Sequence, residues 1–357
     1  MGVLGKKQGS SANSPWLILV FGLILFSSFS TIAQNAFAQT ETIAAVITGS
    51  DFFPLAVTVN PNNNMIYATD GAANQLDIVN GTTNTIAGTI PTGNQPFGVA
   101  VNPNTDRIFV TNRNDGTMTV IDGQEKTVMK TITLPGYPQG IAVDPNSNKV
   151  YVAGVKGSTG SVFVYNANNG KLTNVIGSYC GAWAVAVNPV TSKVYVTSAF
   201  SNGCAPNNMV YVIDENSNTI VSSFQAGPAG LYAYDVQVNP ATNRIYVSTF
   251  GGSSEGVYVA DGSTNSIIAY VQATEPRGIA VNPTTDKVYV TNLNDGTLSI
   301  IDGQTNTLLG VIPPCQPGPP STCMPDLSQY AVANPKTNMI YVGTGSTTGM
   351  IVINGNP

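Results

Sequence analysis

The chain has 357 residues, a formal net charge of −5 and a sequence pI near 4.6, and only 9% of its residues are charged. This acidic balance, without any basic stripe, argues against sequence-independent binding of nucleic acid. Histidine is absent, which removes the most frequent general base, the most frequent metal ligand and the usual axial ligand of haem. We therefore expect neither a metal site nor a cofactor.

The N-terminal residues 1–38 have the pattern of a secretory signal peptide. Lys6 and Lys7 precede the apolar run Trp16–Phe26, and Ala36-Phe37-Ala38 provides a small-residue cleavage site. An uncleaved membrane anchor is the alternative interpretation. No second apolar stretch occurs near the C-terminus. We predict a mature domain, residues 39–357, that has no transmembrane segment and is secreted or held at the cell surface.

A repeat of about forty residues runs through this domain. An Asn-Pro or Asp-Pro pair follows an alternating apolar run seven times, beginning at Asn60, Asn102, Asp144, Asn188, Asn239, Asn282 and Asn334. In the repeat around Asn102, strands are expected at Phe97–Val101, Arg107–Thr111, Thr117–Ile121 and Thr127–Leu134, separated by turns rich in Asn, Asp and Gly. Four short strands per repeat predict a blade, and seven repeats predict an all-β, seven-bladed β-propeller.

One aromatic residue occurs seven positions after each of these Asn or Asp residues: Tyr67, Phe109, Tyr151, Tyr195, Tyr246, Tyr289 and Tyr341. Its presence in every repeat indicates packing between or beneath the blades and not a binding array. The strings FVTN (109–112), YVTN (289–292) and YVTS (195–198), together with IDGQTNT (301–307), resemble the YVTN-type β-propeller repeat family. This resemblance covers residues 41–357 and implies an archaeal or bacterial surface-layer-like or cell-surface protein.

The two ends of the domain are predicted to close the ring. The last repeat ends at residues 351–357, after its third strand, whereas Thr42–Thr48 has the pattern of a fourth strand without a blade. Pairing this segment with the last repeat would remove two exposed strand edges.

The repeats differ mainly in loops that the propeller topology places on one face. The longest are Ser198–Asn208, Gly251–Gly256 and Pro313–Gln329. They hold Cys204, Cys315 and Cys323, and Cys180 lies in another loop on the same face. In an exported chain an even number of cysteines predicts disulfides. We expect Cys180 to pair with Cys204 and Cys315 with Cys323; metal ligation by four thiolates is the alternative.

The first strand of each blade lines the central channel, and its first residues should surround the mouth on the elaborated face. This position predicts a ligand site formed by Phe97, Gln139, Trp183, Tyr234, Asp235, Arg277, Gln329 and Tyr330. Aromatic groups with one Arg and one Asp suit a small polar or sugar-like ligand. A solvated rim around channel-filling aromatics is the competing interpretation.

Two further features fall on the opposite, uniform face. Basic residues recur at one repeat position: Arg107, Lys149, Lys193, Arg244 and Lys287. They suggest either docking of an anionic cell-wall polymer or a partner protein, or ordinary solvated strand starts. Asn80-Gly81-Thr82 is a glycosylation sequon.

The sequence therefore predicts an extracellular or cell-surface, non-catalytic binding or scaffold module. Its partner would be a cell-wall or surface glycan or a protein. The alternative is a metal-assisted lactonase or hydrolase acting at the channel mouth, which would need several converging carboxylates. Asp235 is the one acid among the mouth positions.

Overall fold

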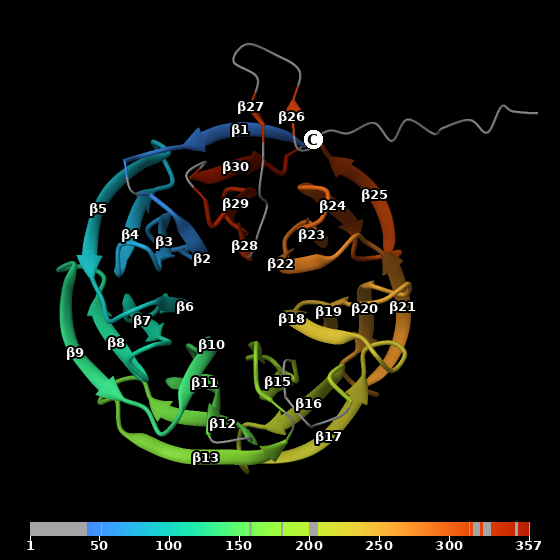
Figure 1. Cartoon of the computed structure of the whole chain (residues 1–357), viewed down its shortest axis with the longest axis horizontal. Coiled ribbons are helices and arrows are strands. Elements are labelled where there is room, and N and C mark those ends of the chain that lie inside the picture. Colours follow the sequence, from blue (N-terminus) through green and yellow to red (C-terminus); the bar gives the residue numbers. More distant parts are fainter. Residues whose placement is uncertain are drawn as a thin grey trace, which may run out of the picture. The chain divides into compact units, whose positions relative to one another are not determined.

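The computed structural model describes residues 41–50, 52–156, 159–179, 181–199, 206–313, 315–316, 322–323, 330–346 and 349–356. Within them the chain forms seven four-stranded antiparallel sheets arranged as the blades of a ring (Figure 1). The predicted seven-bladed β-propeller is confirmed. The predicted signal peptide, residues 1–38, lies outside the described residues, and so do Cys180, Cys204 and Gln329.

Each blade has four strands, which we name a to d from the channel outward. The blades are numbered 1 to 7 in the chain order of their a strands. These are β2 (Pro54–Asn60), β6 (Pro96–Asn102), β10 (Tyr137–Asp144), β14 (Val185–Asn188), β18 (Tyr232–Asn239), β22 (Pro276–Asn282) and β28 (Tyr330–Asn334). The b strands are β3 (Met65–Asp70), β7 (Arg107–Asn112), β11 (Lys149–Lys156), β15 (Lys193–Thr197), β19 (Arg244–Phe250), β23 (Lys287–Asn292) and β29 (Met339–Gly343).

The c and d strands complete the blades. The c strands are β4 (Gln75–Asn80), β8 (Thr117–Asp122), β12 (Thr159–Asn166), β16 (Met209–Asp214), β20 (Gly256–Asp261), β24 (Thr297–Asp302) and β30 (Met350–Asn354). The d strands are β5 (Thr85–Pro91), β9 (Thr127–Thr133), β13 (Leu172–Tyr179), β17 (Thr219–Gln225), β21 (Ser266–Gln272), β25 (Thr307–Ile312) and β1 (Thr42–Ile47). A separate hairpin consists of β26 (Cys315–Gln316) and β27 (Thr322–Cys323).

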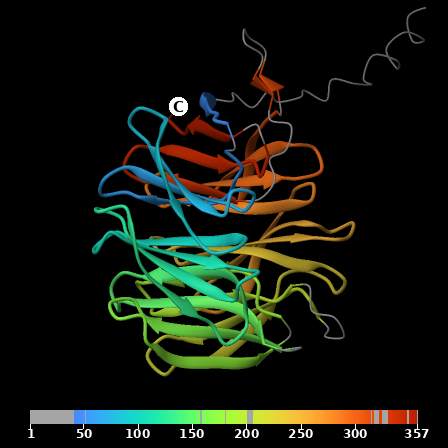
Figure 2. The same ribbon diagram turned by 60° about the vertical axis from the view of Figure 1, so that its left-hand side comes forward.

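The N-terminal strand closes the ring as the sequence predicts. β1 pairs antiparallel with β30, with Thr42 opposite Asn354 and Ile47 opposite Met350. The Glu41 carboxylate, 4% exposed, also forms an ion pair with Lys287 of the preceding blade. Figure 2 shows the sheets from the side, with hairpin turns projecting from the ring. Among the described residues, no helix is long and apolar enough to cross a membrane.

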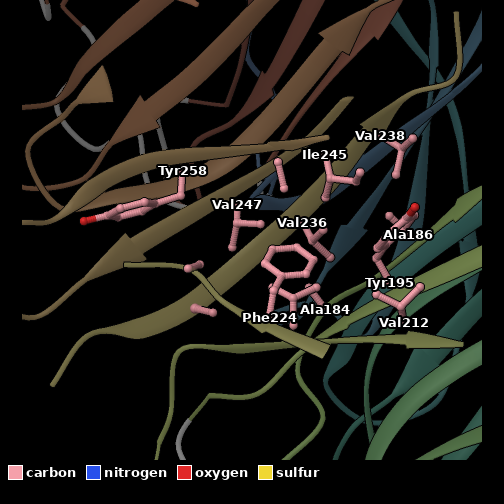
Figure 3. Packing of buried hydrophobic residues seen from close by; sticks show 14 of the residues in the cluster. Ala184, Ala186, Tyr195, Val212, Phe224, Val236, Val238, Ile245, Val247 and Tyr258 are labelled. Carbon is pink, nitrogen blue, oxygen red and sulfur yellow. The ribbon is translucent and has the colours of Figure 1, made fainter. Parts of the chain in front are cut away.

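The hydrophobic core lies between neighbouring blades. In the cluster shown in Figure 3, side chains such as Val212 and Phe224 from blade 4 pack against Val236 and Val247 from blade 5. The recurrent aromatic residue is at most 1% exposed in every blade. Its interpretation as a packing residue is confirmed, because each blade buries its faces only by contacting the next.

The Asn residues of the repeat tie the blades together on the uniform face. Asn102 Nδ2 donates to Asn148 Oδ1 at 3.0 Å in the next blade, and Asn334 Nδ2 donates to Asn64 Oδ1 at 2.7 Å across the ring closure. The acceptor residues occupy the last position of the a–b turn, with φ between 52° and 57°. Asn and Asp tolerate this left-handed conformation better than most residues.

The Thr of the YVTN-like motif links the blades nearer the mouth. Thr111 Oγ1 accepts from Gly98 N at 2.8 Å and donates to the carbonyl oxygen of Gln139 in the next blade at 2.8 Å. Equivalent hydroxyl bridges reach the carbonyl oxygens of Phe97, Tyr234 and Arg277. The repeated hydroxyl therefore holds the backbone at the positions where the sequence predicted mouth residues.

Candidate functional site

Four aromatic side chains meet at the centre of the mouth, and we call them the aromatic plug: Phe97, Trp183, Tyr234 and Tyr330. Phe97 contacts Trp183 and Tyr330 with ring centroids 5.6 and 6.1 Å apart. Tyr234 contacts the same two residues at 5.6 and 6.1 Å. These four predicted site residues come from blades 2, 4, 5 and 7, and each ring contacts two of the others. Phe97 and Tyr234 are only 6% and 3% exposed, so their main role is to fill the channel.

Arg277, another predicted site residue, lies beside the plug and has a carboxylate partner. Its guanidinium carbon lies 4.7 Å from the ring centroid of Tyr234 and 4.0 Å from that of Phe250. Its Nη2 atom forms an ion pair with Glu275 Oε1 at 2.6 Å. Because both the charge and the flat faces of this guanidinium are engaged, Arg277 is a supporting residue of the plug more than a ligand-binding group.

Arg113 is the second arginine at the mouth and has no such partner. Its guanidinium carbon lies 5.4 Å from the ring centroid of Phe97 and 5.5 Å from that of Trp183. In the part of the chain that the structure describes, no carboxylate forms an ion pair with Arg113, and its side chain donates no hydrogen bond. The edge of this guanidinium therefore retains its donors for an acceptor from outside.

Arg113 borders a pocket of about 300 Å³ beside the plug. The lining comes from blades 2, 3 and 4 and comprises Arg113, Asn114, Tyr137, Gln139, Val155, Trp183 and Ala199. Tyr137 is 64% exposed, whereas Gln139 is 5% exposed. No donor among the described residues reaches Gln139 Oε1, which is buried. The pocket thus combines a cationic donor, a buried acceptor and two aromatic side chains.

Asp235 lies inside the channel and not at its open rim. Its carboxylate accepts from the backbone N–H groups of Val236 at 2.8 Å and Ile279 at 2.9 Å, so it joins blade 5 to blade 6. Burial raises the pKa of Asp235 from 3.8 to about 7, although these N–H groups act in the opposite direction. The cavity that Asp235 lines with Phe97 and Tyr330 measures only about 80 Å³. That space holds a few water molecules and is too small for a substrate.

The basic residues of the opposite face mostly contact the chain itself. Arg107 Nη1 donates to the carbonyl oxygen of Asn168 in the next blade at 2.9 Å, and Lys149 Nζ donates to that of Glu215 at 2.7 Å. Lys193 forms an ion pair with Asp214 at 2.6 Å, and Lys287 pairs with Glu41. These contacts favour a structural role over docking of an anionic polymer.

The propeller has counterparts among solved structures. The hydrazine synthase of Kuenenia stuttgartiensis matches with a TM-score of 0.74 and 16% sequence identity, over 87% of this chain and 98% of that one. At this identity the likeness shows the fold alone. No family model matches the chain, and no curated protein matches it. In the described residues, no three Cys, Asp or Glu side chains gather as metal ligands would.

Five pocket residues were not among the predicted site residues: Arg113, Asn114, Tyr137, Val155 and Ala199. Arg113 belongs to the b–c turn TNRNDG (111–116), whose counterpart in blade 6 is TNLNDG (291–296). The signal available in the sequence was that Arg113 is basic where the matching turn of blade 6 has Leu293. Tyr137 immediately precedes Pro138 at the start of β10, and nothing in its sequence context distinguishes it from a loop residue.

Proposed function

We propose that this chain is an exported, non-catalytic binding module of the YVTN-type propeller family, which retains a small polar ligand or a glycan at the cell surface. The pocket bounded by Arg113, Tyr137, Gln139 and Trp183 carries this proposal. It lies on the elaborated face and offers polar groups that the described residues leave unpaired. Binding sites of this kind are concave, partly aromatic and supplied with a few oriented polar groups.

The signal-peptide pattern of residues 1–38 and the repeat resemblance support the extracellular setting. The contacts around the site support a binding surface that is formed before the ligand arrives. Hydroxyl bridges fix the backbone at Gln139, and the packed aromatic plug supports Trp183 from one side. The acid that the lactonase alternative would need, Asp235, is bound by two backbone N–H groups in a cavity of about 80 Å³.

A ligand panel tests the proposal directly. The exported protein is incubated with surface glycans, their oligosaccharides and small polar metabolites, and thermal unfolding is recorded. Ligand at 100 times its Kd stabilises a protein by about 2.7 kcal/mol, which raises the unfolding midpoint by several degrees. Chromatography of each stabilising ligand after prolonged incubation should recover it unchanged.

A pair of variants locates the binding. Tyr137→Ser removes an exposed ring from the pocket, and loss of about 1 kcal/mol of aromatic contact should weaken binding roughly fivefold. Val190→Ser removes a side chain that is 72% exposed in the a–b turn of blade 4, on the opposite face, and should leave affinity unchanged. A panel without any stabilising ligand, equal weakening by both variants, or conversion of the ligand would refute the proposed function.

A further inference from the structure

Within the described ranges of the chain, the pocket beside the plug presents a cationic donor and an acceptor that have no partner. The guanidinium of Arg113 is positioned by the rings of Phe97 and Trp183, and its backbone N–H donates to Gln95 O at 2.9 Å. The nearby Asp115 carboxylate accepts from Asn94 N at 2.7 Å. This fixed guanidinium retains its fork of N–H donors, which matches the two oxygens of a carboxylate.

The unpaired acceptor is Gln139 Oε1. Leaving a buried polar atom without a partner costs about 1–3 kcal/mol of folding free energy. The Gln139 residue is only 5% exposed, and its Oε1 atom is buried. Because Oε1 only accepts, its natural partner is a hydroxyl or N–H group of a ligand. A phosphate or sulfate group would place acceptor oxygens opposite Gln139 Oε1, and two acceptors repel each other. A fitting ligand therefore carries an anion and a hydroxyl or N–H donor on the same small unit.

The remaining lining sets the shape of the ligand. Trp183 and Tyr137 provide aromatic surface, and a volume of about 300 Å³ is at the lower end of ligand pockets. One six-membered ring fits this description, with apolar C–H faces toward the aromatic groups and polar substituents at its edge. The exposed position of Tyr137 leaves room for a chain to continue beyond the pocket.

We propose that the pocket binds one hexuronic acid residue of an acidic polysaccharide. The carboxylate accepts from the Arg113 guanidinium, and a ring hydroxyl donates to Gln139 Oε1. Tyr137 and Trp183 contact the sugar ring. This inference rests on the proposed function and specifies the ligand class of the same site.

The test compares charged and neutral forms of one sugar on the wild-type protein. Trigalacturonic acid, its fully methyl-esterified form and the neutral galactose trisaccharide are titrated by calorimetry. The esterified form keeps the ring hydroxyls and loses the charge. We expect the acid to bind at least tenfold more tightly than either neutral form, and its affinity to decrease with added salt.

Two leucine variants assign the effect to Arg113. Arg113→Leu reproduces the residue of blade 6, where Leu293 N donates to Glu275 O at 3.1 Å just as Arg113 N does to Gln95 O, so the turn should be retained. Lys171→Leu removes one exposed positive charge from the c–d turn of blade 3, on the opposite face. Binding of the acid should weaken at least tenfold in the first variant and remain unchanged in the second.

The outcomes separate this inference from the function on which it rests. Equal binding of the acid and its methyl ester, or full retention of affinity in Arg113→Leu, would overturn the uronate assignment. If a neutral glycan instead binds in a Tyr137-dependent manner, the proposed function stands and the ligand class is wrong. If no glycan or metabolite binds the wild type, both are wrong.

Discussion

Two buried carboxyl groups in blade 1 provide a sharp test of how the repeat stabilises the protein. In blade 2, Asn112 Nδ2 donates to Thr119 Oγ1 at 2.8 Å, and in blade 6 Asn292 Nδ2 donates to Ser299 Oγ at 2.9 Å. The equivalent residues in blade 1 are Asp70 and Asp77, which are 0% and 1% exposed. Replacing the second acid by threonine (Asp77→Thr) restores a hydroxyl that can donate to the Asp70 carboxylate.

The structure sets the expected magnitude. Burial, followed by the neighbouring Asp70 charge, raises the pKa of Asp77 from 3.8 to about 7. Each pKa unit corresponds to about 1.4 kcal/mol, so this rise in the Asp77 pKa corresponds to about 4 kcal/mol of lost stability above pH 7. The contribution of the protonated Asp77 carboxyl to the free energy of unfolding of the wild type is fully present below pH 4 and is lost as the pH rises through 7. The variant also loses the bond from Gln75 Nε2 to Asp77 Oδ1, 2.8 Å long and worth about 1 kcal/mol.

Asp77→Thr should therefore be more stable than the wild type by roughly 2–3 kcal/mol at pH 8 and slightly less stable at pH 4. Denaturant unfolding at pH 4, 6 and 8 measures the difference in the free energy of unfolding. Asp235 and Glu215, whose pKa values burial also raises, are present in both proteins and cancel. Glu125→Thr, which removes an exposed carboxylate, is the matched control. A variant that shows no gain between pH 4 and pH 8 beyond that control would refute the reasoning.

Three further predictions concern the scaffold. Thr111→Val leaves Gly98 N and Gln139 O without the hydroxyl that bridges them and should cost about 1–3 kcal/mol of unfolding free energy. The control, Thr131→Val at an exposed position of β9, should cost almost nothing. Equal effects of the two substitutions would contradict the bridging role. Ile47→Ala in β1, 4% exposed in the wild type, should cost about 2–4 kcal/mol, and a neutral result would contradict ring closure as a source of stability. The hairpin β26–β27 places Cys315 opposite Cys323, at a Cα separation that a disulfide spans, so mass spectrometry of an unreduced digest should find them linked; free thiols or other pairings would be the contrary result.

The sequence predicted the scaffold well because one local pattern is repeated seven times. In the repeat used as the type, the strands expected at Phe97–Val101 and Arg107–Thr111 extend in the structure by at most one residue at either end. Asn-Pro turns interrupt the alternating apolar runs at fixed points, which limits the error at each boundary. Closure by Thr42–Ile47 was also predictable, because the last repeat contains only three strands and the domain begins with one that has no blade.

The site was predicted only in part, because its residues come together through packing between blades. The repeat position identified Phe97, Trp183, Tyr234 and Tyr330 as mouth residues, but not that their rings fill the mouth. Arg113 and Tyr137 are in a turn and at the first residue of a strand, and the sequence does not show that both border one pocket with Gln139. Side-chain directions across three blades depend on the twist of each sheet, which no single repeat encodes.

The central claim is that the pocket between Arg113 and Gln139, on the elaborated face, is where this propeller binds its ligand. A crystal structure of the protein with trigalacturonic acid tests it most directly. We expect one sugar ring against Tyr137 and Trp183, with its carboxylate at the Arg113 guanidinium and a hydroxyl at Gln139 Oε1. A bound sugar found only on the uniform face, with the pocket occupied by water alone, would contradict the claim.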